Sequence, residues 1–141
     1  MSLERIVVTP MARIEVHGGD VLHALRASDA GFAGFGEAYF SWVNPGAVKG
    51  WKLHSRMTMN LVVPIGNVQF AFLREDRAQA RAEVLGEDRY ARLTVPPRVW
   101  FAFRSMSSAP SLLLNVASIE HDPAEVERLP LSEIDYHWPQ P

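Results

Sequence analysis

The sequence contains no cysteine among its 141 residues. This absence excludes disulfide bridges, thiolate catalysis and every cysteine-ligated zinc or iron–sulfur site. It agrees with a reducing compartment, so we expect a cytoplasmic location. A chain of this length can bury most of its apolar surface without covalent support, and we expect one domain over residues 1–141.

The sequence also lacks a strong excess of charge and a long apolar run. Its formal net charge is −2 and its lysine and arginine residues are scattered, so the basic patch of a nucleic-acid-binding protein is missing. The longest apolar stretch, LVVPIGNVQFAFL, is interrupted by Pro64 and Gly66 and is too short to span a membrane. The opening residues MSLERIVVTP carry charges where the apolar core of a signal peptide would lie. We therefore expect neither nucleic acid nor a membrane as a partner.

The sequence does have a series of short segments with the two-residue period of β-strands. Apolar and polar residues alternate in EAYFSWV (37–43), NVQFAFL (67–73) and YARLTV (90–95). VWFAF (99–103) and SLLLNV (111–116) are richer in apolar residues and fit strands buried on one or both faces. Turn-forming stretches such as NPGAVKG and VPPR separate these segments. Many short strands at even spacing predict an all-β sandwich or barrel.

Two segments depart from the strand pattern. The polar stretch 74–83 fits either a surface helix or a long hairpin loop, and the sequence leaves both open. Near the end, HDPAEVERL contains a helix start: Asp122 is a suitable N-cap, Pro123 suits the first helical position and Glu125 the third. We expect a short C-terminal helix over 123–128.

Basic side chains occupy alternate positions in the segment KGWKLHSR. Because side chains alternate across a strand, Lys52, His54 and Arg56 are predicted to share one face. The spacing of this region resembles the first cupin motif, a glycine, two histidines one residue apart, an acid and a second glycine. Gly46, Lys52, His54, Met59 and Gly66 fall at those intervals.

A second cupin motif resembles the segment PPRVWF (96–101), with Arg98 in place of its glycine and Phe101 in place of its histidine. Together with GFGEAYFSWVNPGAVKGW and HDPAEVERLP, the pattern is most similar to short cupins of the dTDP-4-dehydrorhamnose 3,5-epimerase and sugar-nucleotide ketoisomerase group. The resemblance implies a jelly-roll β-barrel of two antiparallel sheets, usually dimeric, with a nucleotide sugar entering the barrel mouth. In such a barrel, the shared face of Lys52, His54 and Arg56 would be the interior.

The resemblance also shows where this sequence differs from the group. The epimerase signature Arg-Gly-x-His, in which arginine meets the diphosphate and histidine is the base, reads Lys49-Gly50-Trp51-Lys52 here. The catalytic tyrosine of the group corresponds to Asn115, and an inward lysine corresponds to Met59. Of the His-x-His pair used by the ketoisomerases, only His54 is present.

Two residues are candidates for acid–base chemistry. His54 is the first, because histidine is the residue type best suited to carry a proton near neutral pH, although a histidine that is only hydrogen-bonded inside a barrel is an equal alternative. Lys52 can act as a base only if burial or a neighbouring cation lowers its pKa from about 10.4. A lysine inside a barrel needs a partner or an anionic ligand, and Glu37 or Tyr39 on the adjacent predicted strand could supply one.

Further residues are candidates for substrate binding. Lys49 suits a diphosphate as a point charge, and a solvated lysine is the alternative. Arg56 lies on the predicted inner face, and Arg98 at a turn can reach a phosphate bidentately. Trp100 can stack on a base or sugar ring, although most tryptophans in short strands are core residues. Asn115 and Tyr39 complete the predicted substrate-binding set.

A metal site or other cofactor is not expected. Only His54 of the five histidines lies on a cupin motif, and Phe101 replaces the ligand of the second motif. A metal-dependent dioxygenase of the cupin class therefore lacks its ligands. The first hypothesis is a metal-independent epimerase or isomerase that acts on a nucleotide-linked 4-keto-6-deoxy sugar by proton transfer next to the ketone. The alternative is a non-catalytic cupin that binds a carbohydrate, a nucleotide sugar or a partner protein.

Overall fold

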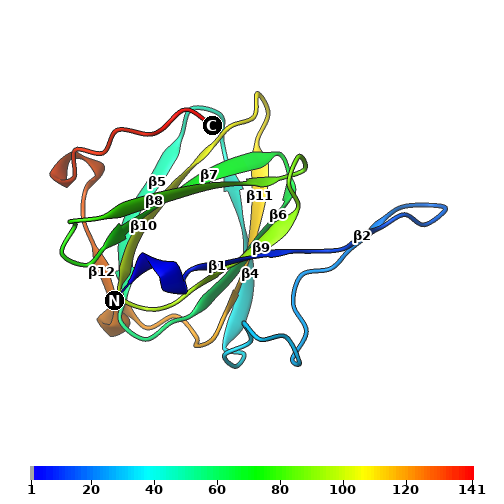
Figure 1. The fold of residues 1–141 in the computed structure, drawn as a ribbon, viewed down its shortest axis with the longest axis horizontal. Helices are drawn as coiled ribbons and strands as arrows, with labels where there is room; N and C mark the ends of the chain where they lie inside the picture. Colours follow the sequence, from blue (N-terminus) through cyan, green and yellow to red (C-terminus); the bar gives the residue numbers. More distant parts are fainter. Residues whose placement is uncertain (1) are drawn as a thin grey trace.

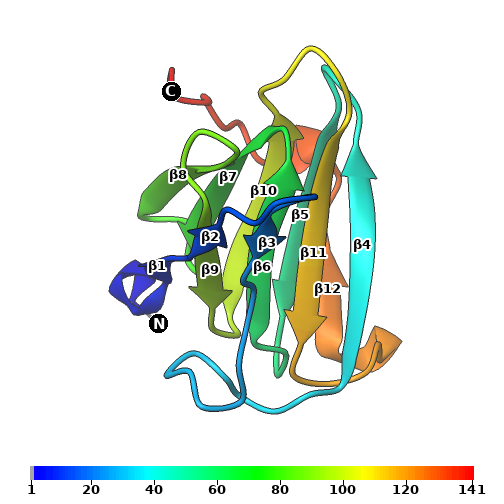
Figure 2. The ribbon, with the colours of Figure 1, turned by 90° about the vertical axis from the view of Figure 1, so that its right-hand side faces the viewer.

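Two five-stranded antiparallel sheets face each other in a computed structural model that describes residues 2–141 (Figure 1). The strands of the first sheet, in spatial order, are β1 (Val7–Pro10), β9 (Ala91–Val95), β6 (Met59–Ile65), β11 (Ser111–Ala117) and β4 (Glu37–Val43). Those of the second sheet are β12 (Val126–Arg128), β5 (Val48–His54), β10 (Val99–Ser105), β7 (Asn67–Arg74) and β8 (Ala80–Gly86). Figure 2 shows the edge strand β4 beside β11.

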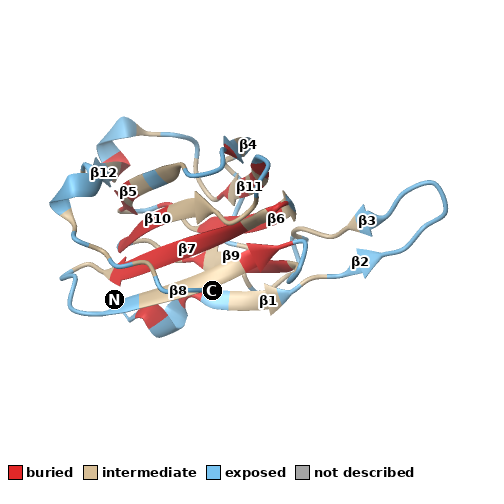
Figure 3. Cartoon of the chain, turned by 90° about the horizontal axis from the view of Figure 1, so that it is seen from above, coloured by how far each residue is buried: buried red, intermediate tan, exposed pale blue. Residues whose placement is uncertain are grey.

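A small hairpin lies outside the two sheets. Its strands β2 (Arg13–Ile14) and β3 (Val21–Leu22) pair only with each other, and the hairpin projects away from the sheets as an exposed arm (Figures 1 and 3). The other elements are single 3-10 turns at Leu3–Arg5, Pro123–Glu125 and Leu131–Glu133. No α-helix occurs within residues 2–141, and nothing in that range is a helix able to cross a membrane.

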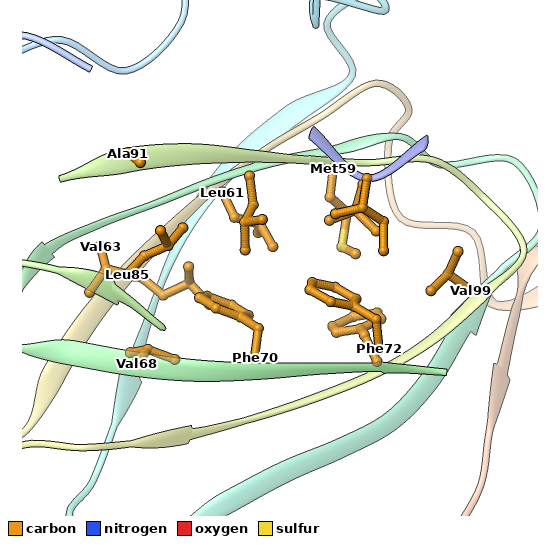
Figure 4. Close-up of a cluster of buried hydrophobic side chains, with 14 of the residues drawn as sticks. Met59, Leu61, Val63, Val68, Phe70, Phe72, Leu85, Ala91 and Val99 are labelled. Atoms are coloured by element: carbon orange, nitrogen blue, oxygen red, sulfur yellow. The ribbon is translucent and has the colours of Figure 1, made fainter. Parts of the chain in front are cut away.

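The main core lies between the sheets and follows from strand alternation. On β7, Val68, Phe70 and Phe72 are fully buried and point inward, as their spacing predicted (Figure 4). The rings of Phe70 and Phe72 stack with their centroids 6.3 Å apart, and Leu61 and Val63 of β6 lie in the same cluster. All five segments predicted as strands are strands, and the all-β fold of two antiparallel sheets is confirmed.

The polar stretch 74–83 is a hairpin, so the second of the two open alternatives is correct. Strand β7 ends at Arg74, a short turn follows, and β8 begins at Ala80. Asp76 stabilises the turn, because its carboxylate accepts hydrogen bonds from the side chain of Arg74 and from the backbone amide of Ala78.

The predicted C-terminal helix over 123–128 is wrong. Asp122 does cap a turn, accepting a 2.9 Å hydrogen bond from the amide of Ala124, but the turn ends at Glu125. The chain then becomes strand β12 and pairs with β5. A helix of six residues is marginal by itself, and the backbone hydrogen bonds offered by the edge of β5 outweigh its local signals.

A second apolar cluster covers the outer face of the second sheet. Its buried members are Trp51, Leu53, Ala71, Leu73, Trp100 and Ala102. The C-terminal segment packs against it through Leu129, Ile134, Tyr136 and Trp138. This packing determines which side chains of β5 face the barrel interior, because Trp51 and Leu53 face the C-terminal segment instead.

Candidate active site

A cavity of about 110 Å³ lies between the sheets, beside the edge strand β4 and strand β5. Its polar lining comes from Tyr39, Ser41, Lys49, Lys52 and Asn115. Ligand pockets usually measure about 300–1,000 Å³, so this cavity is smaller than a usual ligand pocket.

The apolar lining of the cavity includes two rings of strand β10. Phe101 and Phe103 lie 6.3 Å apart with nearly parallel planes. They face Met59, Leu61 and Leu113 of the first sheet. A sugar ring that entered would contact apolar surface on two sides and polar groups at the edge strands.

A bulge in β5 places two lysines on the same face. Lys52 pairs with Phe101 and Gly50 with Ala102, so the intervening Trp51 has no partner on β10. The extra residue shifts the alternation, and both Lys49 and Lys52 line the cavity. The Nζ of Lys49 also donates a 2.7 Å hydrogen bond to the backbone carbonyl of Trp42. Regular alternation would have turned Lys49 away from Lys52.

Glycine is required at the bulge. Gly50 has a φ of +152°, and a Cβ there would lie 2.4 Å from the Cβ of Ala102. A side chain at this position would clash with Ala102 of β10, so the bulge requires glycine here.

Lys52 is half-buried and has no carboxylate partner among residues 2–141. Burial lowers the pKa of its amine, and the positive charges of Arg128 and Lys49 lower it further. Lys52 is therefore the cavity residue whose environment favours the neutral, proton-accepting amine.

Tyr39 and Asn115 form a polar pair across the cavity from β5. The Nδ2 of Asn115 donates a 3.0 Å hydrogen bond to the hydroxyl oxygen of Tyr39. This bond leaves the Tyr39 proton available to another acceptor, such as a substrate oxygen. The Oδ1 of Asn115 is buried without a hydrogen-bond partner, so it can accept one from a ligand.

His54 is buried on the same face of β5 as Lys52, as predicted, but it adds nothing to the cavity lining. Its Nδ1 is hydrogen-bonded to Oε1 of Glu125. The other oxygen, Oε2, accepts from the backbone amides of Arg56 and Met57, each at 3.1 Å. Phe101 stacks on the imidazole with ring centroids 5.8 Å apart, and Phe101 itself lines the cavity.

The Glu125 carboxylate sets the tautomer of His54. Burial by itself raises the pKa of Glu125, but the hydrogen bonds from His54 and the two backbone amides outweigh it and hold the pKa below its usual value. An ionised carboxylate only accepts hydrogen bonds, so the imidazole carries its proton on Nδ1 and leaves Nε2 for another partner.

Three residues predicted to bind substrate do not reach the cavity. Arg56 points to solvent and pairs with Asp122 at 2.9 Å, because β5 ends at His54 and the alternation ends with it. Arg98 also points outward from its turn and pairs with Glu75 at 2.6 Å. Trp100 lies in the apolar cluster beneath the C-terminal segment. None of the three lines the cavity between the sheets.

Sequence reasoning missed two residues that lie next to His54 and Lys52. The sequence pattern predicts Glu125 as a helix-capping residue and Arg128 as part of the same helix. Both reach β5 because β12 pairs with it, with Arg128 opposite Lys52. No local signal in the sequence indicates a pairing between strands more than seventy residues apart.

The residues around the cavity do not fit a metal. Within residues 2–141, no three histidine or carboxylate side chains lie together. The Nδ1 of His54 is hydrogen-bonded to Glu125, and the ring of Phe101 stacks on the imidazole.

Comparison with known proteins places the fold among sugar-nucleotide enzymes, although no family model matches the chain. The dTDP sugar isomerase of Desulfovibrio desulfuricans is 35% identical, with a TM-score of 0.89 over 96% of this chain and 91% of that one. The sugar 3,4-ketoisomerase QdtA of Thermoanaerobacterium thermosaccharolyticum, solved with TDP, is 19% identical, with a TM-score of 0.77 over 91% and 90%. The probable low-salt glycan biosynthesis epimerase Agl13 of Haloferax volcanii is 27% identical over 66% of this chain. The match spans just under two thirds of that relative, 65%.

Proposed function

Because the chain belongs to the cupin family of dTDP-sugar epimerases and ketoisomerases, we propose that it epimerises or isomerises a nucleotide-linked 4-keto-6-deoxy sugar. The observation that carries the proposal is the position of Lys52, a half-buried amine without a carboxylate partner on the wall of the barrel cavity. Such an amine can take a proton from a carbon next to a ketone.

The proposed proton transfer needs no redox partner. Neutral Lys52 takes the proton, the C–H bond breaks, and its electron pair moves to the ketone oxygen to give an enolate. The hydroxyl of Tyr39, oriented by Asn115, donates a hydrogen bond to that oxygen. For an epimer, a solvent proton reaches the opposite face of the same carbon, and Lys52 then releases its own proton to solvent. For a ketoisomer, the hydroxyl on the carbon that lost its proton gives its proton to the former ketone oxygen and becomes the new ketone, while Lys52 returns its proton to the former ketone carbon.

His54 is the second candidate base. It contributes nothing to the cavity lining, so it reaches a substrate carbon only if Phe101 turns aside. We assign the first proton transfer to Lys52 for this reason, and Lys49 helps to neutralise the diphosphate beside it.

Two observations favour the alternative of a non-catalytic binding protein. The cavity measures about 110 Å³, which is smaller than the pockets that usually enclose a small-molecule ligand. In addition, Asn115 stands where the group has a catalytic tyrosine. In that case the same polar residues would hold a sugar without moving a proton.

Deuterium exchange separates the two functions. The protein is incubated in deuterated water with dTDP-4-keto-6-deoxyglucose, and NMR follows C3 and C5 while calorimetry measures binding. We expect deuterium at one or both carbons, or a ketone that moves to C3. Measurable binding without deuterium uptake or ketone movement would favour the binding protein.

We also propose that the protein is a homodimer that serves polysaccharide synthesis in the cytoplasm. Support for the dimer comes from the outer face of the first sheet, where Phe40 is 64% and Trp42 55% exposed. The projecting arm adds exposed apolar residues, Ile14, Val16 and Val21. Exposed apolar groups in this number are typical of an association surface.

A further inference from the structure

We propose that Arg128 is a positioning residue for Lys52, which places a second positive charge beside the amine and so favours its neutral form. This role depends on the proposed function, in which Lys52 accepts the substrate proton. Arg128 lies on the edge strand β12, outside both cupin motifs.

The register of β12 on β5 brings the two side chains together. Arg128 is directly opposite Lys52, and Glu127 is opposite Leu53. Directly opposed residues of an antiparallel pair lie on the same face, with Cβ atoms about 5 Å apart. Leu53 is buried in the outer cluster beneath the C-terminal segment, so Lys52 and Arg128 both lie on the other face, toward the barrel.

The charge of Arg128 is not neutralised within the described chain. Its guanidinium makes no ion pair among residues 2–141, and the residue is exposed at the sheet edge. A permanently charged side chain in this place repels a protonated Lys52 and does not repel a neutral one.

No carboxylate of residues 2–141 lines the cavity around Lys52, and Glu37 at the start of β4 lies outside that lining. Strand β10 presents Phe101 and Phe103, β6 presents Met59 and Leu61, β11 presents Asn115, and β4 presents Tyr39 and Ser41. On β5 itself, Lys49 adds another positive charge, and His54 is paired with Glu125. Glu125 is fully engaged, because both of its oxygens already accept hydrogen bonds.

Burial and these two cations act in the same direction. Burial is the largest cause of the lowered pKa of Lys52, and Arg128 is the larger of the two charge effects. The same repulsion acts after proton transfer, since the ammonium form of Lys52 is then destabilised and returns its proton to the enolate more readily. Arg128 therefore assists both directions of the exchange.

The test uses the full-length variants Arg128→Gln and Arg128→Lys. The matched control is Arg89→Gln, which removes the same charge from an arginine near β8, at the opposite edge of the second sheet. NMR titration of the Lys52 Cε resonance gives its pKa directly, and the pH profile of deuterium exchange gives the pKa seen by the reaction. Loss of the Lys52 resonance in Lys52→Arg assigns the signal.

We expect Arg128→Gln to raise both pKa values together and to slow exchange at pH 7, about tenfold for each unit of the rise. Arg128→Lys should restore the wild-type values, and Arg89→Gln should leave them unchanged. An active wild type whose Lys52 pKa is the same in Arg128→Gln would overturn this inference and leave the proposed function standing. A wild type that binds the sugar but exchanges no deuterium would overturn both.

Discussion

At the scale of single residues, the site contains two ionisable groups, Lys52 and Glu125, that are both partly removed from water but have different neighbours. Lys52 has lost hydration without gaining a carboxylate, which favours its neutral form. Glu125 has lost hydration too, but it gains His54 and two backbone amides and stays ionised. The surroundings thus lower the pKa of Lys52 and hold the pKa of Glu125 below its usual value.

Replacement of Glu125 by glutamine tests the second interaction. Glutamine cannot supply the ionised oxygens, so we expect the free energy of unfolding to fall by about 1–3 kcal/mol at pH 7. Because the folded pKa of Glu125 is lowered, its contribution is present above its ordinary pKa of about 4.3 and is lost as the pH falls through the lower folded value. Urea unfolding should therefore show a smaller difference between wild type and Glu125→Gln at acid pH. A difference that is constant with pH would contradict an ionised Glu125.

At the scale of elements, the C-terminal segment holds the strand that carries the candidate base. Trp51, on the reverse face of β5, exchanges two backbone hydrogen bonds with Leu129 and contacts the ring of Tyr136 edge-on at 5.6 Å. Tyr136 contacts Trp138 at 5.1 Å, and Arg104 lies over the Trp138 ring at 4.8 Å. Aromatic contacts thus connect the end of the chain to the bulge of β5.

Removal of the last aromatic ring tests this connection. We expect Trp138→Ala to lower the free energy of unfolding by about 1–3 kcal/mol, since a half-buried tryptophan and its cation–π contact are lost. Hydrogen exchange at the amides of β5 should become faster. Phe35→Ala is the matched control, because Phe35 is 66% exposed and its loss should change stability by less than about 0.5 kcal/mol. Equal effects of the two substitutions would show that the segment does not hold β5.

Much of the fold could be predicted from local patterns, whereas the site could not. The period of two in segments such as 67–73 gave the correct strands, because alternation reports which face is buried. The bulge at Gly50 is invisible to the same rule, which by itself would turn Lys49 to the face opposite Lys52. The same alternation puts Arg56 inside the barrel, but β5 ends at His54, and Arg56 points to solvent and pairs with Asp122.

The residues that sequence reasoning missed share one cause. Glu125 and Arg128 carry good helix signals, and their true positions come from a pairing between β12 and β5 that only the folded chain creates. Local propensity describes what a segment prefers alone, while tertiary contacts decide where its side chains lie.

At the scale of the whole molecule, the outer face of one sheet is covered and that of the other carries exposed apolar side chains. The second sheet is covered by the C-terminal segment, but the outer face of the first sheet leaves Phe40 and Trp42 exposed. We expect light scattering to give the mass of a dimer for the wild type and of a monomer for a Phe40→Glu, Trp42→Glu double variant. Circular dichroism should remain that of the folded protein. A folded double variant that is still dimeric would place the interface elsewhere.

The central claim is that Lys52 takes the substrate proton, and the rate of deuterium uptake by dTDP-4-keto-6-deoxyglucose with Lys52→Met tests it most directly. Lys49→Met is the matched control, since it removes the same charge from the same cavity. The account predicts that Lys52→Met slows exchange by about 10²–10⁴-fold under saturating substrate, while Lys49→Met mainly weakens binding. Wild-type exchange by Lys52→Met, with exchange lost instead in His54→Asn, would contradict it.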